Sequence, residues 1–249
     1  MEIPLFPLHA VLCPGIVLPL HVFEERYRAL TRHCLATGAP FGIVLIRDGR
    51  EVGAGGTLAL AEVGALVEIR EADRYPDGRY DLLAAATGRF AIDRVDLARA
   101  PYLVADVTPL EDEVGDEQRA ERLAASAIRR FVRYLELMRI GDGETGEALD
   151  IRVELDSDLT AREAVEERPA KPVTTTSLAI PDDPTVLSHL LSGIVQIELP
   201  RRQHLLEATT TVRRLEELIT LLDREVLLLA RRLRLFSPGS RLADGSRRS

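Results

Sequence analysis

The stretch Ile3–Leu30, "IPLFPLHAVLCPGIVLPLHVFEERYRAL", decides the fold of this chain. It opens with short apolar runs broken by prolines, which is typical of strands and turns. Apolar residues then recur at helical spacing, i, i+4, i+7 and i+11, at Phe23, Tyr27, Leu30 and Cys34. The pattern predicts a helix over residues 22–35 that follows a strand-like segment ended by Pro19.

The stretch also predicts the contacts of individual side chains. We expect Phe23 and Tyr27 to anchor the helix on a sheet. Arg26 lies off the apolar stripe, so we expect it to make a buried or semi-buried polar contact that fixes the helix to a loop. His21 with Glu24 and Glu25 comes within one substitution of the H-x-x-E-H zinc pattern, but it would supply only two ligands on a helix. The sequence therefore predicts no metal site, and a His21 at the helix entry that is hydrogen-bonded to backbone.

The rest of the first 110 residues is rich in short β-type runs. Turn signals such as Asp48-Gly49, Pro76-Asp77-Gly78 and Gly88 separate them. Six or so strands at this spacing predict a compact sheet or barrel. The runs are "PFGIVLI", "TLALAEV", "ALVEIREA", "RYDLLAAATG", "RFAIDRVDL" and "YLVADVTPL".

Helical periodicity takes over after the acidic segment 111–117, which reads as a hinge. The pattern predicts a long helix that ends near Gly141. Three further helices follow, opened by Asp183-Pro184, by Pro200 and by the threonines 209–211, the last with a broad leucine stripe. The fold class is α+β: a β domain at 1–112, a helical domain at 113–236 with an acidic mobile insertion at about 142–178, and a disordered tail at 237–249.

Composition limits the class of protein. The chain has 249 residues, a net charge of −8 and no apolar run long enough to span a membrane. Its N-terminus has no basic region of the kind that opens a signal peptide. Two cysteines, Cys13 and Cys34, are too few for a disulfide framework. We expect a cytoplasmic protein without contact to a membrane, and the acidic balance makes a nucleic-acid partner unfavourable.

Known catalytic patterns are missing from the sequence. "GAGG" at residues 53–56 lacks the Lys-Ser/Thr ending of a phosphate-binding loop and favours a hairpin turn or a bulge. Ser188-His189 reads as the face of a helix. The arginine-rich helix faces of the last fifty residues read as solvated, with a partner-docking surface as the less favoured reading. We expect no catalytic residue, no metal ligand and no cofactor.

The opening stretch resembles the substrate-binding N-terminal domain of Lon proteases. The family's order of motifs is a strand, a Pro-Gly turn, a Leu-Pro-Leu segment and a helix with Phe-Glu-x-Arg-Tyr. Here these are Leu5-Phe6-Pro7-Leu8, Val11-Leu12-Cys13-Pro14-Gly15, Leu18-Pro19-Leu20 and Phe23-Glu24-Glu25-Arg26-Tyr27. "DGRYDLLAAATGRFAI", "PYLVADVTPLED" and "RRQHLLEATTTVRRLEELITLLDREVLLL" are similar to later parts of the domain, and Cys13 replaces a bulky apolar residue. The residues that carry the family signature, as structural or binding positions, are Pro14, Gly15, Pro19, Phe23, Glu24, Arg26 and Tyr27.

The resemblance implies a PUA-like β pseudo-barrel with one inserted helix, followed by a helical bundle. It also implies a non-enzymatic module that binds unfolded or degron-bearing polypeptides, as an adaptor or regulator of proteolysis that works with a separate protease or ATPase. The sequence lacks the P-loop ATPase and Ser–Lys peptidase motifs of the full proteases. Two alternatives stay open: RNA binding through the PUA-like barrel, and a small-molecule-binding domain or an unrecognised enzyme. The oligomeric state is not predicted.

Overall fold

The opening stretch forms two strands and a helix in the computed structural model, which describes residues 1–48, 59–141 and 180–236. β1 (Glu2–Leu8) and β2 (Val17–Val22) are followed by α1 (Glu25–Thr37). α1 thus begins later than the sequence predicted. Pro19 lies inside β2, where Pro19 faces Leu83, and so does not end the strand. Because β2 pairs only with β6 among the described strands, Pro19 sits on an edge strand, where the missing N–H is tolerated.

Five strands close a barrel, as the sequence predicted in outline. The order β1-β7-β6-β5-β3 returns to β1 through a parallel pairing of β1 with β3. β6 is one continuous strand, whereas the sequence predicted two. Its length lets β5 pair along one edge while β2 and β7 share the other. The remaining strands are β3 (Phe41–Asp48), β4 (Ala59–Leu60), β5 (Val63–Arg74), β6 (Tyr80–Asp96) and β7 (Leu103–Leu110).

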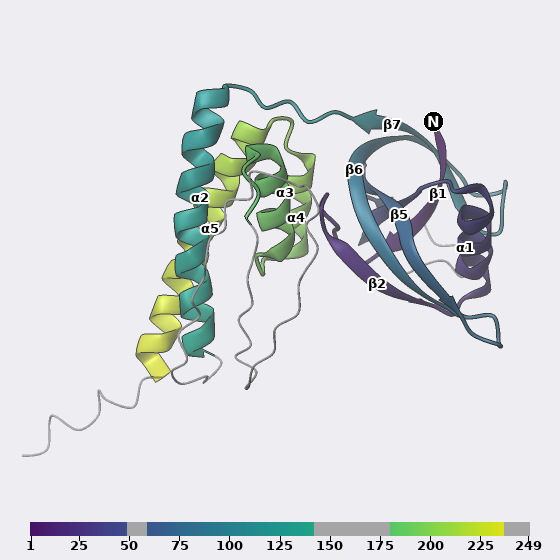
Figure 1. The fold of residues 1–249 in the computed structure, drawn as a ribbon, viewed down its shortest axis with the longest axis horizontal. Coiled ribbons are helices and arrows are strands. Elements are labelled where there is room, and N and C mark those ends of the chain that lie inside the picture. The colour runs from purple at the N-terminus through teal and green to yellow at the C-terminus, as the bar shows by residue number, and fades with distance from the viewer. Residues whose placement is uncertain (49–58, 142–179, 237–249) are drawn as a thin grey trace, which may run out of the picture.

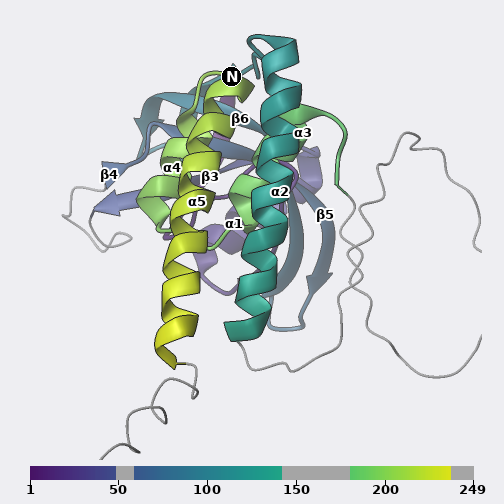
Figure 2. The same ribbon diagram turned by 90° about the vertical axis from the view of Figure 1, so that its left-hand side faces the viewer.

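Within the described residues, four helices follow the barrel and form two layers against it. Figures 1 and 2 show α3 and α4 between the barrel and the long pair α2 and α5. The helices are α2 (Glu117–Gly141), α3 (Pro184–Ile194), α4 (Leu199–Glu207) and α5 (Thr211–Phe236). The α+β class, with a β pseudo-barrel followed by helices, agrees with the sequence-based expectation. The division at residues 112 and 113 stays a proposal. The 53–56 turn, the 142–178 insertion and the 237–249 tail lie outside the described residues.

Two helix starts follow the predicted capping chemistry. The Asp183 carboxylate accepts hydrogen bonds from the backbone N–H groups of Thr185 and Val186, with Pro184 in the first turn. The Thr210 hydroxyl accepts from the Arg213 N–H at the start of α5. Such caps satisfy donors that the first turn of a helix leaves without partners.

The described residues form three apolar core clusters. One fills the barrel beneath α1, a second fills the other half of the barrel and reaches α4, and the third lies among the helices. On α1, Tyr27, Leu30 and Cys34 are buried as the helical stripe predicted, and the Tyr27 ring stacks on Phe6 at 4.0 Å between centroids. The leucine stripe of α5 is buried at Leu215 and Leu222. The expected wider burial is confirmed at Leu218 but fails at Leu227 and Leu228, which are exposed.

Candidate functional site

The signature turn Pro14-Gly15 helps to join the barrel to the helices. Gly15 adopts a φ of 82°, which favours glycine, and its N–H donates to the Ala86 carbonyl at 2.9 Å. The next residue, Ile16, lies against Gly193 of α3. A Cβ on Gly193 would come within 2.4 Å of the Ile16 side chain, so this glycine permits the close approach of α3.

Exposed apolar side chains gather on the outer face of β2 and its neighbours. Val17 and Phe23 are 49% and 62% exposed, and Pro19 lies on the same face of the strand between them. Val17 and Pro19 stand opposite Ala85 and Leu83 of β6, which continue the apolar surface across the strand pair. We call this surface the outer patch; its members are Val17, Pro19, His21, Phe23, Tyr75, Leu83 and Ala85. The predicted role of Phe23 as an anchor of α1 is wrong, because Phe23 precedes the helix and faces solvent.

The polar end of the outer patch is fixed by an aspartate. Asp81 accepts hydrogen bonds from His21 Nδ1 and from the Tyr75 hydroxyl, each at 2.5 Å. These bonds lower the pKa of the Asp81 carboxyl. The centroid of the His21 ring lies 6.3 Å from that of Phe23 and 6.1 Å from that of Tyr75. His21 is therefore a strand residue paired with a carboxylate, and the predicted backbone bond at a helix entry is wrong.

Three signature residues mark the start of α1. Glu24 takes the N-cap position without a side-chain cap and instead pairs with Arg26 at 2.8 Å. Arg26 is half-buried, and its guanidinium carbon lies 4.5 Å from the centre of the Tyr27 ring. A contact that ties α1 to a loop is found at Arg28, whose Nε donates to the Gly78 carbonyl at 2.7 Å. The assignment of such a tie to Arg26 stays a prediction.

Replacing Arg26 tests that prediction. We expect Arg26→Ala to remove the pair with Glu24 and the contact with the Tyr27 ring, and so to lower the melting temperature by roughly 2–4 °C, the effect of about 1 kcal/mol in a chain of this size. Thermal unfolding followed by circular dichroism measures it. Arg129→Ala, an exposed arginine on α2, is the control. An Arg26 variant that melts with the native chain would contradict the prediction.

A second constellation lies where barrel and helices meet, and the sequence did not reveal it. The Asp112 carboxylate accepts from Arg89 of β6 at 2.6 Å, from Arg214 of α5 at 3.1 Å and lies 3.0 Å from His189 Nε2 of α3. We call these four residues the junction cluster. Arg89, His189 and Arg214 have side chains no more than 3% exposed. Ser188 and His189 lie on a helix, α3, as the sequence predicted, but both are buried there.

The junction cluster also binds the C-terminal end of α4. Arg89 donates to the Leu206 and Ala208 carbonyls at 2.7 and 3.0 Å, and Arg214 donates to Leu205 and Ala208 at 3.1 Å. The last carbonyls of a helix carry partial negative charge, so they offset the second guanidinium that Asp112 alone leaves unbalanced. Ser188 Oγ accepts from Arg214 and donates to the Thr185 carbonyl, an arrangement that holds it in place. The cluster is a structural junction.

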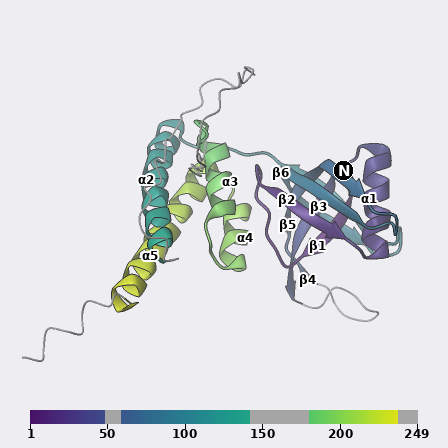
Figure 3. The ribbon, with the colours of Figure 1, turned by 60° about the horizontal axis from the view of Figure 1, so that its bottom comes forward.

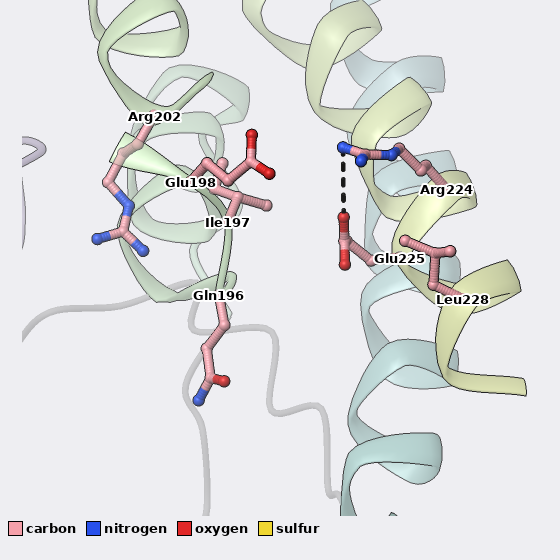
Figure 4. Close-up of a pocket in the computed structure, with 7 residues that line it drawn as sticks. All are labelled: Gln196, Ile197, Glu198, Arg202, Arg224, Glu225 and Leu228. Carbon is pink, nitrogen blue, oxygen red and sulfur yellow. Dashed lines mark ion pairs between the residues drawn. The ribbon is translucent and has the colours of Figure 1, made fainter. Parts of the chain in front are cut away.

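Two grooves flank α4 where it lies beside α5. One has a volume of about 510 Å³ and mixes apolar Ile197 and Leu228 with Arg202, Arg224 and Glu225. Figure 4 shows Glu225 and Leu228 directed from α5 toward the connection between α3 and α4. The other groove, of about 620 Å³, takes Glu217 and Leu221 from α5. Unlike the outer patch, both grooves are strongly charged.

The described part of the chain shows no group of metal ligands, and its two thiols are buried. There, no three His, Cys, Asp or Glu side chains are placed to hold a metal ion. Cys13 and Cys34 are buried, and burial raises the pKa of each thiol to about 11. Over residues 1–48, 59–141 and 180–236, no helix is both long and apolar enough to cross a bilayer.

Comparison with known proteins gives one consistent result. The family model described as the ATP-dependent protease La (LON) substrate-binding domain matches residues 2–224. The Lon protease of Brevibacillus choshinensis is 25% identical over 238 residues, which are 93% of this chain and 26% of that protein. Lon protease 2 of Myxococcus xanthus is 27% identical over 93% of this chain and 25% of its own length. The chain thus spans about a quarter of the length of the curated relatives it matches.

Solved structures agree with the barrel-and-helix architecture. A Lon N-terminal domain protein from Xanthomonas campestris matches with a TM-score of 0.55 and 26% identity, covering 88% of this chain and 98% of that one. The N-terminal domain of Mycobacterium avium complex Lon protease matches with a TM-score of 0.59 and 17% identity, covering 90% and 98%. The match to the Mycobacterium avium complex domain, at 17% identity, shows a similar fold alone.

Proposed function

The chain belongs to the family of the Lon substrate-binding domain, and on this premise we propose that it binds unfolded polypeptides through the outer patch. In this proposal the bound polypeptide is passed to a separate protease or ATPase, and the chain itself carries out no chemistry. The proposal rests on one observation: Val17, Pro19 and His21 are exposed on one face of β2, and the exposed rings of Phe23 and Tyr75 lie 6.3 and 6.1 Å from that of His21.

The chemistry of the outer patch fits extended apolar segments. Folded proteins bury such segments, so a surface of this kind distinguishes unfolded chains from folded ones. The Phe23 and Tyr75 rings supply the large, stiff contact areas that dominate binding energies, and the Arg79 guanidinium carbon lies 5.4 Å from the Tyr75 ring centre. Pro19 has no N–H to offer at the middle of the β2 edge. We therefore propose that side chains, more than added strand pairing, hold the polypeptide.

Placing a charge in the outer patch should abolish most of this binding. We expect Phe23→Asp to weaken the affinity for a permanently unfolded, carboxymethylated client by at least about tenfold, because an aromatic hot spot contributes about 2 kcal/mol or more. Fluorescence anisotropy with a labelled client measures the affinity. The melting temperature should hold, since Phe23 is 62% exposed.

Leu97→Asp is the matched control. Leu97 is 72% exposed and lies outside the outer patch, so its variant should bind like the native chain. Native-like binding by Phe23→Asp, or equal binding of the folded, uncarboxymethylated form of the client, would refute the proposal.

A further inference from the structure

A row of carboxylates borders the outer patch on its β5 side. β6 lies between β2 and β5 and pairs with both strands. Residues that stand opposite one another in an antiparallel pair project from the same face of the sheet. The β5 partners of Ala85, Leu83 and Asp81 therefore lie on the face of the outer patch, and all three are exposed acids. We call them the acidic column; in chain order they are Glu68, Glu71 and Asp73.

A bulge in β5 brings these acids onto one face. Strict alternation along a strand would place Glu68 and Glu71, three positions apart, on opposite faces. The pairing register shifts between Ile69 and Glu71, so Arg70 is the extra residue of a bulge and both glutamates face the same way. Alternation read from the sequence alone does not reveal this alignment.

The acidic column is close enough to the outer patch to act on the same ligand. Glu71 stands opposite Leu83, which in turn stands opposite Pro19. Because neighbouring strands lie about 5 Å apart, Glu71 is two strand spacings, about 10 Å, from Pro19. Figures 1 and 3 show β2, β6 and β5 side by side in the wall of the barrel. A polypeptide that lies over β6 therefore has the apolar side chains of β2 on one side and the acidic column on the other.

At the Tyr75 end of the outer patch, the charge of the acidic column also acts on the phenol. The hydrogen bond to Asp81 raises the pKa of the Tyr75 hydroxyl, and the negative charges of Asp81 and Asp73 add to this effect. Asp73 is thus an electrostatic neighbour of an aromatic residue of the outer patch.

Most of the acidic column is available to a cationic ligand. Among the described residues, neither Glu71 nor Asp73 has an ion-pair partner. Glu68 pairs with Arg70 at 3.4 Å, but the two side chains are 49% and 55% exposed. An exposed pair of this kind is weak, so a client cation can compete for Glu68 as well.

From the register of the three strands and the free carboxylates we propose that the outer patch selects apolar segments that carry Lys or Arg close to their apolar residues. The inference rests on the proposed polypeptide binding and adds the charge of the client to it. Apolar side chains of the client lie against β2 and β6, and its cationic side chains reach the acidic column. Each exposed pair contributes little affinity, but the column repels segments in which Glu or Asp takes the same place, and such repulsion sets specificity.

Three labelled peptides test this selection on the full chain. They share an unfolded core of alternating Phe and Ser and differ in their flanking residues, which are Lys, Gln or Glu. At a salt concentration of about 0.01 M, we expect the Lys peptide to bind at least about fivefold tighter than the Glu peptide, with the Gln peptide between them. At about 1 M, where the Debye length falls to about 3 Å, this difference should disappear. Fluorescence anisotropy measures the affinities, and equal affinities for the Lys and Glu peptides at low salt would overturn the inference.

Reversing two charges of the acidic column should reverse the order of the peptides. In Glu71→Lys/Asp73→Lys we expect the Glu peptide to bind tighter than the Lys peptide, while the affinity for the Gln peptide stays within about twofold. Glu117→Lys/Glu121→Lys is the matched control, because these exposed acids lie on α2 and the variant changes the net charge equally. The neutral variant Glu71→Gln/Asp73→Asn should bring the affinities for the Lys and Glu peptides together, and far-UV circular dichroism checks that each variant keeps the native fold. A control that changes the order as much as the acidic-column variant would show a general charge effect and refute the site.

The Phe23→Asp chain separates this inference from the proposal on which it rests. Its affinity for the Gln peptide, whose flanks carry no charge, should fall at least about tenfold. Equal binding of the Lys and Glu peptides by the native chain, together with this loss, would overturn the charge selection alone. Unchanged binding of the Gln peptide by Phe23→Asp would overturn the polypeptide-binding proposal as well.

Discussion

Asp112→Asn should lower the free energy of unfolding by about 3–5 kcal/mol, the range seen when one partner is removed from a buried ion pair. The carboxylate lies between Arg89 and Arg214, whose side chains are 2% and 0% exposed. Asparagine keeps the shape but removes the charge, so the two buried guanidiniums would lose their carboxylate partner and keep neutral acceptors, among them Ser188 Oγ and carbonyls at the C-terminal end of α4. Urea unfolding at pH 7, followed by far-UV circular dichroism, measures the loss.

Asp223→Asn is the control for this variant. Asp223 accepts from Arg130 Nε at 2.7 Å, a distance similar to that of Asp112, but its side chain is 57% exposed. Exposed ion pairs contribute about 1 kcal/mol at most. Equal losses in the two variants would show that the junction cluster adds no more than a surface pair.

The effect of Asp112→Asn should also depend on pH. Burial disfavours the Asp112 charge, but the hydrogen bond from His189 and the charges of His189, Arg89 and Arg214 outweigh it, so the pKa of Asp112 is held well below its ordinary value. A carboxyl with a depressed folded-state pKa stabilises the fold above its unfolded pKa of about 3.9 and loses that contribution as the pH falls further. The difference between native chain and variant should therefore be constant above about pH 5 and shrink toward pH 2. A difference that does not change with pH would contradict this assignment.

The junction cluster shows where sequence periodicity stops being informative. The segment 111–117 reads as an acidic hinge, and nothing local separates Asp112 from its acidic neighbours. His189 lies 77 positions away, Arg214 102 and Arg89 23. Helical period tells which residues share a face, but it does not tell which distant side chain will cover that face. The predicted division at residue 112 falls on the residue that ties the two parts together.

At the start of α1, by contrast, the helical spacing of apolar residues predicted burial correctly for the residues inside the helix. Tyr27, Leu30 and Cys34 are buried because each lies inside the helix, where the i, i+3 and i+4 spacing holds. Phe23 has the same spacing from Tyr27, but the helix begins at Glu25, so its side chain takes a different direction. Family resemblance pointed to the signature residues, whereas Tyr75, Leu83 and Ala85 of the outer patch come beside β2 only when the β5–β6 hairpin is folded.

Phe90 fills the barrel at a level where two neighbouring strands carry glycine. Its side chain is 1% exposed, and a Cβ placed on Gly42 of β3 or on Gly64 of β5 would come within 2.5 Å of its Cζ. The two glycines thus leave the space that the ring occupies. We expect Phe90→Ala to cost about 3–5 kcal/mol, because interiors are close-packed and the deletion leaves a cavity between those strands. Urea unfolding measures it, with Phe23→Ala at the exposed outer patch as a control expected to change stability by about 0.5 kcal/mol or less.

Gly42→Ala, in β3, tests whether the loss of stability in Phe90→Ala comes from this packing or from a general sensitivity of β6 to substitution. In the native chain Gly42→Ala should destabilise by about 1–3 kcal/mol, because the new methyl group meets Phe90 Cζ at 2.5 Å and Leu5 Cδ2 at 2.8 Å. In the Phe90→Ala background the same methyl group enters the cavity, so the cost should disappear and Gly42→Ala should be neutral or stabilising. The coupling free energy from the four proteins is the quantity that decides. If Gly42→Ala costs the same in both backgrounds, the ring and the glycine do not share this space. If the cost disappears only without the ring, Gly42 leaves the space that the Phe90 ring fills, and the two residues together set the internal volume of the barrel at this level.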